Sequence, residues 1–286
     1  MTIYNIMKRI YGIIGDPVAH SLSPVMHNAA FEKLGLDALY LAFRVSKGEL
    51  KDAIRGAKSL GIAGLNVTIP LKEKALFFVN AEEEAKKIGA INTIDFGSGT
   101  PVGYNTDGIG SMQALKEVVD EIKGKKVLIL GAGGAARAIS FYLDAEGAKV
   151  TIANRTKERA AQLTSILHNA KSIGLGAELT KQLKDMDILI NATSVGMHPN
   201  EDATLVRADL MHPDLVVFDI VYNPMETKLL KEAKKAGVKK VVDGVKMLVY
   251  QGAASFKIWT KKEPPIAEME KAVRDVLNSI PKRKVL

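Results

Sequence analysis

The chain contains no cysteine, few histidines and no apolar run long enough to cross a membrane. The lack of cysteine excludes disulfide bonds, thiolate zinc sites and cysteine nucleophiles. The five histidines form no cluster with ligand spacing, so we predict no metal site and structural roles for His20 and His27. Residues 1–9 lack the apolar core of a signal peptide, and we have no role for them. The expected location is therefore the cytoplasm.

What is present is the composition of a globular protein with a basic charge. The 286 residues are 47% apolar and 25% charged, with a formal net charge of +8, and suffice for two domains. A basic charge is one sign of nucleic-acid binding. However, the lysines alternate with glutamates, as at 82–87, which is typical of paired helix faces. A basic surface also suits an enzyme whose ligands are anions, so we predict no nucleic-acid partner.

Short apolar segments alternate with amphipathic segments from end to end, which predicts an α/β fold with parallel sheets covered by helices. Strands are expected at 10–15, 38–45, 62–69, 127–130, 149–153, 187–192, 215–221 and 238–242, with a hairpin of 90–96 and 102–105. Helices are expected at 24–34, 47–60, 71–79, 109–122, 245–260 and 266–277. No flexible linker separates the halves, so we expect two domains that share long helices and meet at a cleft.

A glycine-rich turn in the middle of the chain carries the most informative motif. Gly131-Ala132-Gly133-Gly134-Ala135-Ala136 follows an apolar strand and opens a helix, which is the G-x-G-x-x-A dinucleotide fingerprint in its usual context. Gly131 permits the tight turn, Gly133 leaves room for phosphates, and Ala136 lets the helix lie close to the strand. The motif predicts a pyrophosphate at the helix N-terminus, so we place the cofactor in residues 107–244.

The end of the next strand indicates which dinucleotide binds. An NAD site usually has Asp or Glu there, to hold the ribose 2′-hydroxyl. This chain has Asn154-Arg155-Thr156 instead, with Arg159 one turn later. Guanidinium groups match a phosphate with a fork of charged donors, which predicts NADP. The alternative is that both arginines are ordinary surface charges.

The first half has no phosphate loop but carries polar residues that a plain scaffold does not need. Ser21 and Ser23 flank a helix start, where they predict a carboxylate site; the alternative for Ser23 is a helix N-cap before Pro24. Lys72 follows Asn66-Val67-Thr68 at another helix start, where a cation is disfavoured by the dipole; a solvated surface lysine is the alternative.

Two further polar segments are Gly89-Ala90-Ile91-Asn92-Thr93 and Gly103-Tyr104-Asn105-Thr106-Asp107-Gly108. Asp107 either caps the next helix or pairs with Lys72. A lysine–carboxylate pair beside a nicotinamide is what hydroxyl–ketone interconversion needs, because a proton must move at the oxygen while a hydride moves at the carbon. We therefore predict that the first half is the substrate domain.

From about Tyr11 to Leu277 these segments, in this order, resemble the NADP-dependent shikimate dehydrogenases of the shikimate/quinate dehydrogenase family. The resemblance rests on the segments 20–24, 66–72, 89–93, 105–107, 131–135, 154–156, 191–194, 222–224 and 247–252. It implies an N-terminal α/β substrate domain, a Rossmann-type NADP domain, and C-terminal helices that return to the first domain, so that the substrate-binding catalytic domain would comprise residues 1–106 and 245–286. It also implies reversible reduction of 3-dehydroshikimate to shikimate, in aromatic amino acid (chorismate) biosynthesis.

The resemblance also implies residue roles. Ser21 and Ser23 would bind the substrate carboxylate, and Lys72 would be the acid–base residue. Substrate hydroxyls would be held by Thr68, Asn92, Asp107 and Gln251, with Asp107 also the partner of Lys72 and Tyr222 near the substrate. The cofactor would be bound by Gly131, Ala132, Gly133, Gly134, Ala135, Asn154, Arg155, Thr156 and Arg159, with Thr193, Val221, Gly244 and Met247 along the nicotinamide side.

Two rival functions stay open at this point. One is a quinate/shikimate dehydrogenase with relaxed cofactor use, which Asn154-Arg155 and Thr68 argue against. The other is a non-catalytic protein that senses NADP or binds nucleic acid, which leaves Lys72, Asp107 and the serines unexplained. The sequence does not fix the oligomeric state, and a homodimer is one option.

Overall fold

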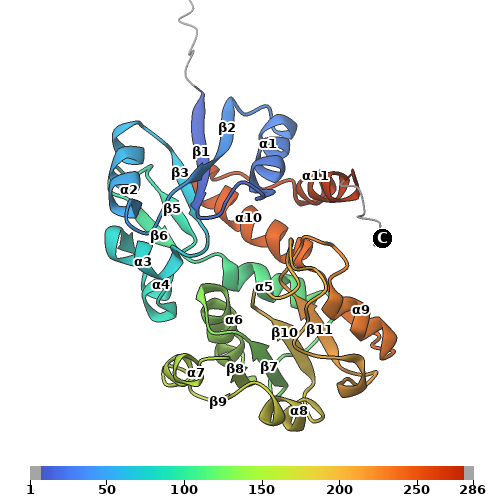
Figure 1. The fold of residues 1–286 in the computed structure, drawn as a ribbon. Coiled ribbons are helices and arrows are strands. Elements are labelled where there is room, and N and C mark those ends of the chain that lie inside the picture. The colour runs from blue at the N-terminus through green and yellow to red at the C-terminus, as the bar shows by residue number, and fades with distance from the viewer. Residues whose placement is uncertain (1–7, 280–286) are drawn as a thin grey trace, which may run out of the picture. The chain divides into compact units, whose positions relative to one another are not determined.

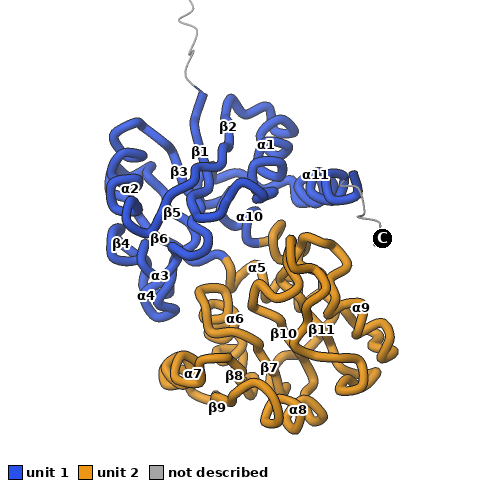
Figure 2. The backbone as a smooth tube through the Cα atoms, viewed as in Figure 1, with its two compact units in different colours: residues 1–106, 251–286 blue, residues 107–250 orange. Residues whose placement is uncertain are grey.

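The computed structural model describes residues 8–279 and divides the chain into two compact units. Unit 1 takes in residues 1–106 and 251–286, and unit 2 takes in residues 107–250 (Figure 2). Each unit is built around its own six-stranded sheet. The division at residue 250 falls within helix α10 (Gly244–Thr260) (Figure 1).

The sheet of unit 1 has the strand order β2-β1-β3-β5-β6-β4. Its strands are β1 (Arg9–Gly15), β2 (Ala38–Arg44), β3 (Gly64–Val67), β4 (Asn80–Ala81), β5 (Thr93–Asp95) and β6 (Val102–Tyr104). β1 is parallel to β2 and β3, whereas β5 is antiparallel to both β3 and β6. The predicted hairpin is confirmed as β5 and β6, and it makes the sheet of unit 1 mixed, with parallel pairing among β1, β2 and β3.

Helix α2 shows how unit 1 buries apolar side chains. The helices of this unit are α1 (Ser23–Lys33), α2 (Leu50–Ser59), α3 (Lys72–Ala75), α4 (Glu83–Ile88), the last part of α10, α11 (Ile266–Ser279), which contacts α1, and a short 3₁₀ turn, η1 (Leu76–Phe78). On α2, Leu50, Ile54 and Ala57 are spaced to lie on one face and are all buried. They pack with Leu65 and Val67 of β3 in one hydrophobic cluster. The core thus holds β3 and the polar residues that follow it in a fixed position.

An aromatic cluster between β1, β2, α1 and α10 encloses a buried histidine. His27 has no exposed surface, and its ring stacks on Tyr40 at 4.4 Å between centroids. Phe31, Phe256 and Trp259 surround it. Within residues 8–279, neither of its ring nitrogens has a hydrogen-bond partner, and burial lowers its pKa from 6.5 to about 3. His27 is therefore neutral and structural, as the sequence predicts.

Replacing His27 by phenylalanine is expected to remove one source of acid sensitivity. The unfolded chain takes up a proton at this histidine below its ordinary pKa, whereas the folded chain does not until about pH 3. Stability from this site is thus full above pH 6.5 and falls by about 1.4 kcal/mol per pH unit below it. The free energy of unfolding, measured in urea between about pH 8 and 5, should show this slope when the value for His27→Phe is subtracted from that for wild type. His20→Asn, at an exposed histidine, is the control. If its stability difference from wild type had the same pH slope as that of His27→Phe, the assignment of this acid sensitivity to the buried His27 would be contradicted.

The sheet of unit 2 is wholly parallel, with the order β12-β11-β10-β7-β8-β9. Its strands are β7 (Lys126–Leu130), β8 (Lys149–Ala153), β9 (Ala170–Ile173), β10 (Ile188–Asn191), β11 (Val216–Asp219) and β12 (Lys240–Val242). Read from β9, the order of the strands along the chain is 3-2-1-4-5-6, that of the Rossmann fold. The expected Rossmann-type domain is confirmed. Its switch point, where ligands bind in such sheets, lies between β7 and β10.

Both faces of this sheet are covered. The helices of unit 2 are α5 (Asp107–Lys116), α6 (Gly134–Ala145), α7 (Lys157–Thr164), α8 (Ala177–Leu183), α9 (Lys228–Lys235), the first part of α10 and the 3₁₀ turn η2 (Ala208–Leu210). Along β7, Val127 and Ile129 pack in one cluster while Leu128 and Leu130 pack in another. This alternation, with both sets buried, is what a parallel sheet between two helix layers requires.

Among residues 8–279, no helix is long and apolar enough to span a membrane. The same described residues contain no group of three or more His, Cys, Asp or Glu side chains arranged to hold a metal ion.

Candidate functional site

The glycine turn of unit 2 has the backbone that its sequence predicts. Strand β7 ends at Leu130, Gly131 has a φ of +108°, and α6 begins at Gly134. A Cβ atom at Gly131 would come 2.9 Å from the carbonyl oxygen of Ala192, so only glycine fits between β7 and β10. Gly133 faces open space, which leaves a cradle for an anion at the helix N-terminus. This geometry fits a dinucleotide pyrophosphate.

The end of β8 presents guanidinium groups and no carboxylate. Asn154 donates its side-chain N–H to the carbonyl of Thr156, at 2.8 Å, which folds the backbone into α7. Arg155 and Arg159 are both exposed. Within the described chain, neither guanidinium forms a hydrogen bond or an ion pair, whereas nearby Lys157 pairs with Glu178 at 3.1 Å. The two arginines are thus available for a 2′-phosphate.

A buried polar network lies at the carboxyl end of β3 in unit 1. Asn66 is 4% exposed and accepts a hydrogen bond from the Tyr40 hydroxyl at 2.7 Å. Its amide donates to Thr93 Oγ1 at 3.1 Å and to Ser255 Oγ at 3.0 Å. Since these partners belong to β2, β5 and α10, the hydrogen bonds of Asn66 link β3 to those three elements.

Two of the predicted substrate residues meet in the continuation of this network. The Asn92 side chain donates to Gln251 Oε1 at 3.1 Å and to Thr106 Oγ1 at 2.9 Å. Its Oδ1 accepts from the backbone N–H of Thr106 at 2.7 Å. The structure therefore brings Asn92 and Gln251 together although they are far apart in sequence. An array of amides and hydroxyls of this kind can hydrogen-bond a polyhydroxylated ring.

The serines occupy the start of α1. Ser23 is 3% exposed, and its backbone N–H donates to Ser21 Oγ at 3.3 Å. The N-cap expected at Ser23 is wrong: the cap position is Leu22, and no side chain caps the helix. The Ser23 hydroxyl instead bonds to Tyr40, whose pKa is raised by burial. Ser23 thus joins the carboxylate site predicted at this helix start to the Asn66 network.

The two residues predicted to handle protons each begin a helix. Lys72 is the first residue of α3, and its backbone carbonyl accepts from Ile91, next to Asn92, at 3.0 Å. Thr68 lies between β3 and this lysine and is partly exposed. Asp107 is the first residue of α5 and is 3% exposed. Lys72 and Asp107 belong to different units, so their pairing stays a prediction.

The remaining predicted cofactor residues follow β10, β11 and β12. Thr193 comes two residues after β10, and its hydroxyl donates to Asn191 Oδ1 at 2.7 Å. Val221 comes two residues after β11, next to Tyr222. A Cβ atom at Gly244 would lie 2.4 Å from the carbonyl carbon of Val221, so glycine is required there. Met247 is buried in the core on the α5–α6 side of the sheet.

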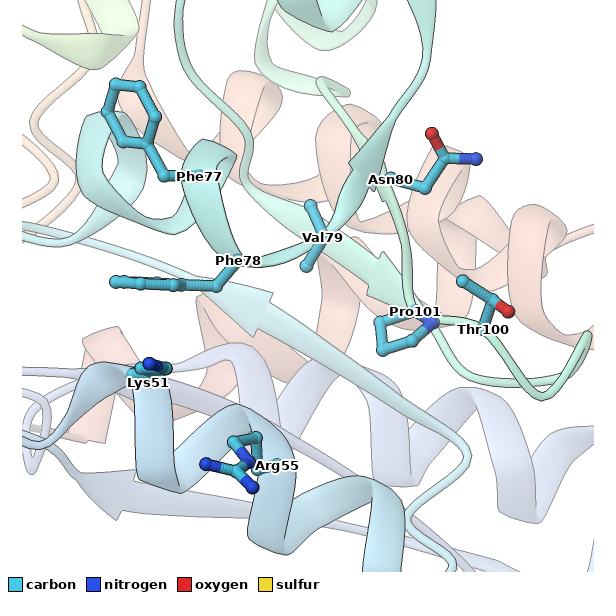
Figure 3. Close-up of a pocket in the computed structure, with 8 residues that line it drawn as sticks. All are labelled: Lys51, Arg55, Phe77, Phe78, Val79, Asn80, Thr100 and Pro101. Atoms are coloured by element: carbon cyan, nitrogen blue, oxygen red, sulfur yellow. The ribbon is translucent and has the colours of Figure 1, made fainter.

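A pocket elsewhere in unit 1 contains none of the predicted site residues (Figure 3). It is lined by Lys51, Arg55, Phe77, Phe78, Val79, Asn80, Thr100 and Pro101. Phe77 is 80% exposed at its edge. The pocket is therefore separate from the network of Asn66 and Asn92.

Some buried polar residues behind the site were not predicted from the sequence. Asp219, Thr227 and Ser255 are fully buried. Asp219 accepts a hydrogen bond from Asn191, Thr227 donates one to Asp219, and Ser255 shares one with Thr93. Each of them is thus linked through a hydrogen-bonded neighbour to a predicted site residue. The available signal was a polar residue at the end of a short apolar strand, as in Val216-Val217-Phe218-Asp219.

Comparisons with known proteins cover both units. Three family models match the chain: the shikimate dehydrogenase substrate binding domain at 13–94, shikimate/quinate 5-dehydrogenase at 113–241, and the shikimate 5′-dehydrogenase C-terminal domain at 244–274. A shikimate dehydrogenase (NADP+) of Methanococcoides burtonii is 57% identical over 272 residues, covering 95% of this chain and 100% of that protein.

Solved structures agree with these matches. A shikimate dehydrogenase in complex with NADP+ has a TM-score of 0.89 at 46% identity, covering 94% of this chain and 96% of the other. The enzyme from Thermus thermophilus, in complex with NADP(H) and shikimate, has a TM-score of 0.85 at 37% identity, covering 93% of this chain and 99% of the other.

Proposed function

The chain belongs to the shikimate dehydrogenase family, and from this we propose that it is an NADP-dependent oxidoreductase that interconverts 3-dehydroshikimate and shikimate. The observation that carries the proposal is the network at Asn92 and Gln251. It gathers amides and hydroxyls in the unit that contains the matched substrate-binding segment. The family role in aromatic amino acid biosynthesis is the metabolic context that we propose.

In the proposed substrate site, each polar group has a separate task. Ser21 and Ser23 bind the carboxylate at the start of α1, where backbone N–H groups favour an anion. Thr68, Asn92 and Gln251 orient the ring hydroxyls. The position of the reacting carbon is then set by the same buried network that fixes Asn92 and Gln251.

Lys72 acts as the acid–base group in this proposal. NADP(H), when bound, supplies or accepts the hydride. Lys72 donates a proton to the oxygen that gains negative charge during reduction, and neutral Lys72 removes that proton during oxidation. Asp107 orients Lys72 and bonds to a ring hydroxyl, while Tyr222 lies near the substrate.

In unit 2 the residues fit the cofactor. Gly131 to Ala135 cradle the pyrophosphate, as the open space at Gly133 allows. Asn154, Arg155, Thr156 and Arg159 hold the adenosine ribose and the 2′-phosphate. Thr193, Val221, Gly244 and Met247 lie along the nicotinamide. We accordingly propose residues 107–244 as the NADP domain, and residues 1–106 with 245–286 as the catalytic domain.

Purified protein with shikimate and NADP+ should produce NADPH, measured by its absorbance at about 340 nm. Because Thr68 and the Asn154-Arg155 pair favour shikimate and NADP, rates with quinate or NAD+ should be at least about tenfold lower, the scale of one lost charged hydrogen bond. If quinate were oxidised as fast as shikimate, and NAD+ reduced as fast as NADP+, the result would instead support a quinate/shikimate dehydrogenase with relaxed cofactor use. NADP binding without turnover on either alcohol would support a sensing protein.

We also propose a cytoplasmic enzyme without a nucleic-acid partner. The net charge of +8 suits the anionic cofactor and substrate, which gives the basic surface a use without nucleic acid. Salt-dependent binding to duplex DNA or RNA at physiological ionic strength would contradict this. Light scattering on a sizing column decides between a monomer and a homodimer.

A further inference from the structure

Asp219, at the end of β11, is a fully buried carboxylate outside the predicted site residues. Its Oδ1 accepts from the Asn191 side chain at 2.9 Å and from the Val221 backbone N–H at 3.1 Å. Its Oδ2 accepts from the Thr227 hydroxyl at 2.7 Å. In the described part of the chain, no lysine or arginine forms an ion pair with it. Burial raises its pKa to about 6, which means that the ionised group costs stability.

The carboxylate sets the direction of the Asn191 amide. An ionised carboxylate only accepts hydrogen bonds, so Asn191 must turn its N–H groups toward Asp219. The same amide nitrogen, which has two N–H donors, also donates to the Val195 carbonyl, at 3.1 Å. The Asn191 oxygen then faces Thr193 and accepts from its hydroxyl at 2.7 Å and its backbone N–H at 3.2 Å.

The Thr193 hydroxyl is consequently held from both sides. It donates to Asn191, and it accepts from the Val195 backbone N–H at 3.1 Å. The buried carboxylate therefore fixes the donor and acceptor direction of the Asn191 amide, and the amide fixes that of the Thr193 hydroxyl, whose residue is partly exposed.

Both segments that Asp219 holds lie against glycines of the proposed cofactor site. A Cβ atom at Gly131 would come 3.0 Å from Thr193 Cγ2, and one at Gly244 would come 2.5 Å from the Val221 carbonyl oxygen. The chain after β10 is thus packed on the pyrophosphate turn, and the chain after β11 on the start of α10. A shift of Thr193 would therefore disturb its packing on Gly131, and a shift of Val221 would disturb its packing on Gly244.

We propose that Asp219 is a positioning residue for the nicotinamide half of NADP, acting on Thr193 through Asn191 and on Val221 through its backbone N–H. The proposal rests on the assignment of NADP to unit 2 under the proposed function. Asp219→Leu removes both acceptor oxygens, so the Asn191 amide and the Val221 N–H each lose a hydrogen-bond partner. The Asn191 amide then loses the group that fixes its direction, and with it the fixed acceptor of the Thr193 hydroxyl.

The test compares two ligands by isothermal titration calorimetry without substrate. NADP+ carries the nicotinamide half, whereas 2′,5′-ADP carries only the adenosine and the 2′-phosphate. Asp219→Leu should weaken NADP+ binding about tenfold, within the range measured for coupled neighbours, and leave 2′,5′-ADP binding within about twofold of wild type. Thr193→Val should weaken NADP+ similarly, and the double variant should add little because the two residues act in one chain.

Thr227→Val is the matched control, because Thr227 bonds to the other carboxylate oxygen and caps α9. It should lower the thermal midpoint but leave NADP+ affinity unchanged. Three results would overturn the proposal: unchanged NADP+ affinity in Asp219→Leu, an equal loss for both ligands in that variant, or an equal loss of NADP+ affinity in Thr227→Val. If Asp219→Leu does not fold, full NADP+ affinity in Thr193→Val would overturn it. NADP+ binding without shikimate oxidation contradicts only the proposed function.

Discussion

Replacing Lys72 by alanine is expected to lower kcat for shikimate oxidation by about a hundredfold or more, the usual scale for an acid–base group. The change in KM should be much smaller, because the carboxylate and the hydroxyls are held by other residues. Steady-state rates of NADPH formation at saturating NADP+ measure both quantities. Lys72 begins α3, and its backbone carbonyl accepts a hydrogen bond from the backbone N–H of Ile91, a contact that an alanine at position 72 can keep.

Lys74→Ala is the matched control for this change. Lys74 lies on the same short helix, is exposed, and bonds through Nζ to the Lys47 carbonyl at 2.8 Å. Its loss removes a positive charge of the same kind and should leave kcat within about twofold, as for most surface substitutions. A normal kcat in Lys72→Ala, or an equal loss in both variants, would remove Lys72 from its proposed role.

Replacing Arg155 by alanine should weaken NADPH binding by about ten- to a hundredfold and barely affect NADH. The loss corresponds to one or two charge-assisted hydrogen bonds to the 2′-phosphate, a group that NADH lacks. Dissociation constants from the quenching or enhancement of nicotinamide fluorescence measure both cofactors on the same preparation.

Lys157→Ala tests whether any nearby positive charge has the same effect. Lys157 also lies at the start of α7, but it pairs with Glu178. We expect it to change NADPH affinity by less than about threefold, the range of an exposed ion pair. Equal losses of NADPH and NADH affinity in Arg155→Ala would contradict a phosphate contact.

The cofactor-binding half of the fold was the easier part to predict from sequence. Strands such as Val127-Leu128-Ile129-Leu130 are continuous apolar runs, because both faces of a parallel sheet are buried. The edge strand β9 (Ala170–Ile173) was missed because its residues are partly polar and show no such run. The helix expected at 109–122 ends at Lys116, just before Val118 and Val119, whose branched side chains disfavour a helix.

In unit 1 the differences come from tertiary contacts that local sequence does not encode. The helix expected at 71–79 is divided into α3 and the turn η1, because Leu76 and Phe78 in its second half pack against the hydrophobic core. Ser23 has the sequence signature of an N-cap, but its hydroxyl is taken by Tyr40 of β2. A local motif cannot show a competing partner from a different strand.

For the site, individual residue types were predictable and their connections were not. Asn92 and Gln251 carried roles from the family resemblance, and the structure adds the 3.1 Å hydrogen bond between them. Nothing in the sequence indicated that Asp219 would bond to Asn191, since the two residues end different strands. Buried polar contacts depend on strand order and register, which here place Asn191 of β10 directly beside Asp219 of β11.

The most direct test is a crystal structure of the protein with shikimate bound. We predict that Lys72 Nζ lies about 3 Å from the hydroxyl oxygen at C3 of shikimate, within hydrogen-bond reach, with the carboxylate at Ser21 and Ser23. A substrate held at another place, with the Lys72 amine directed into solvent, would contradict the account.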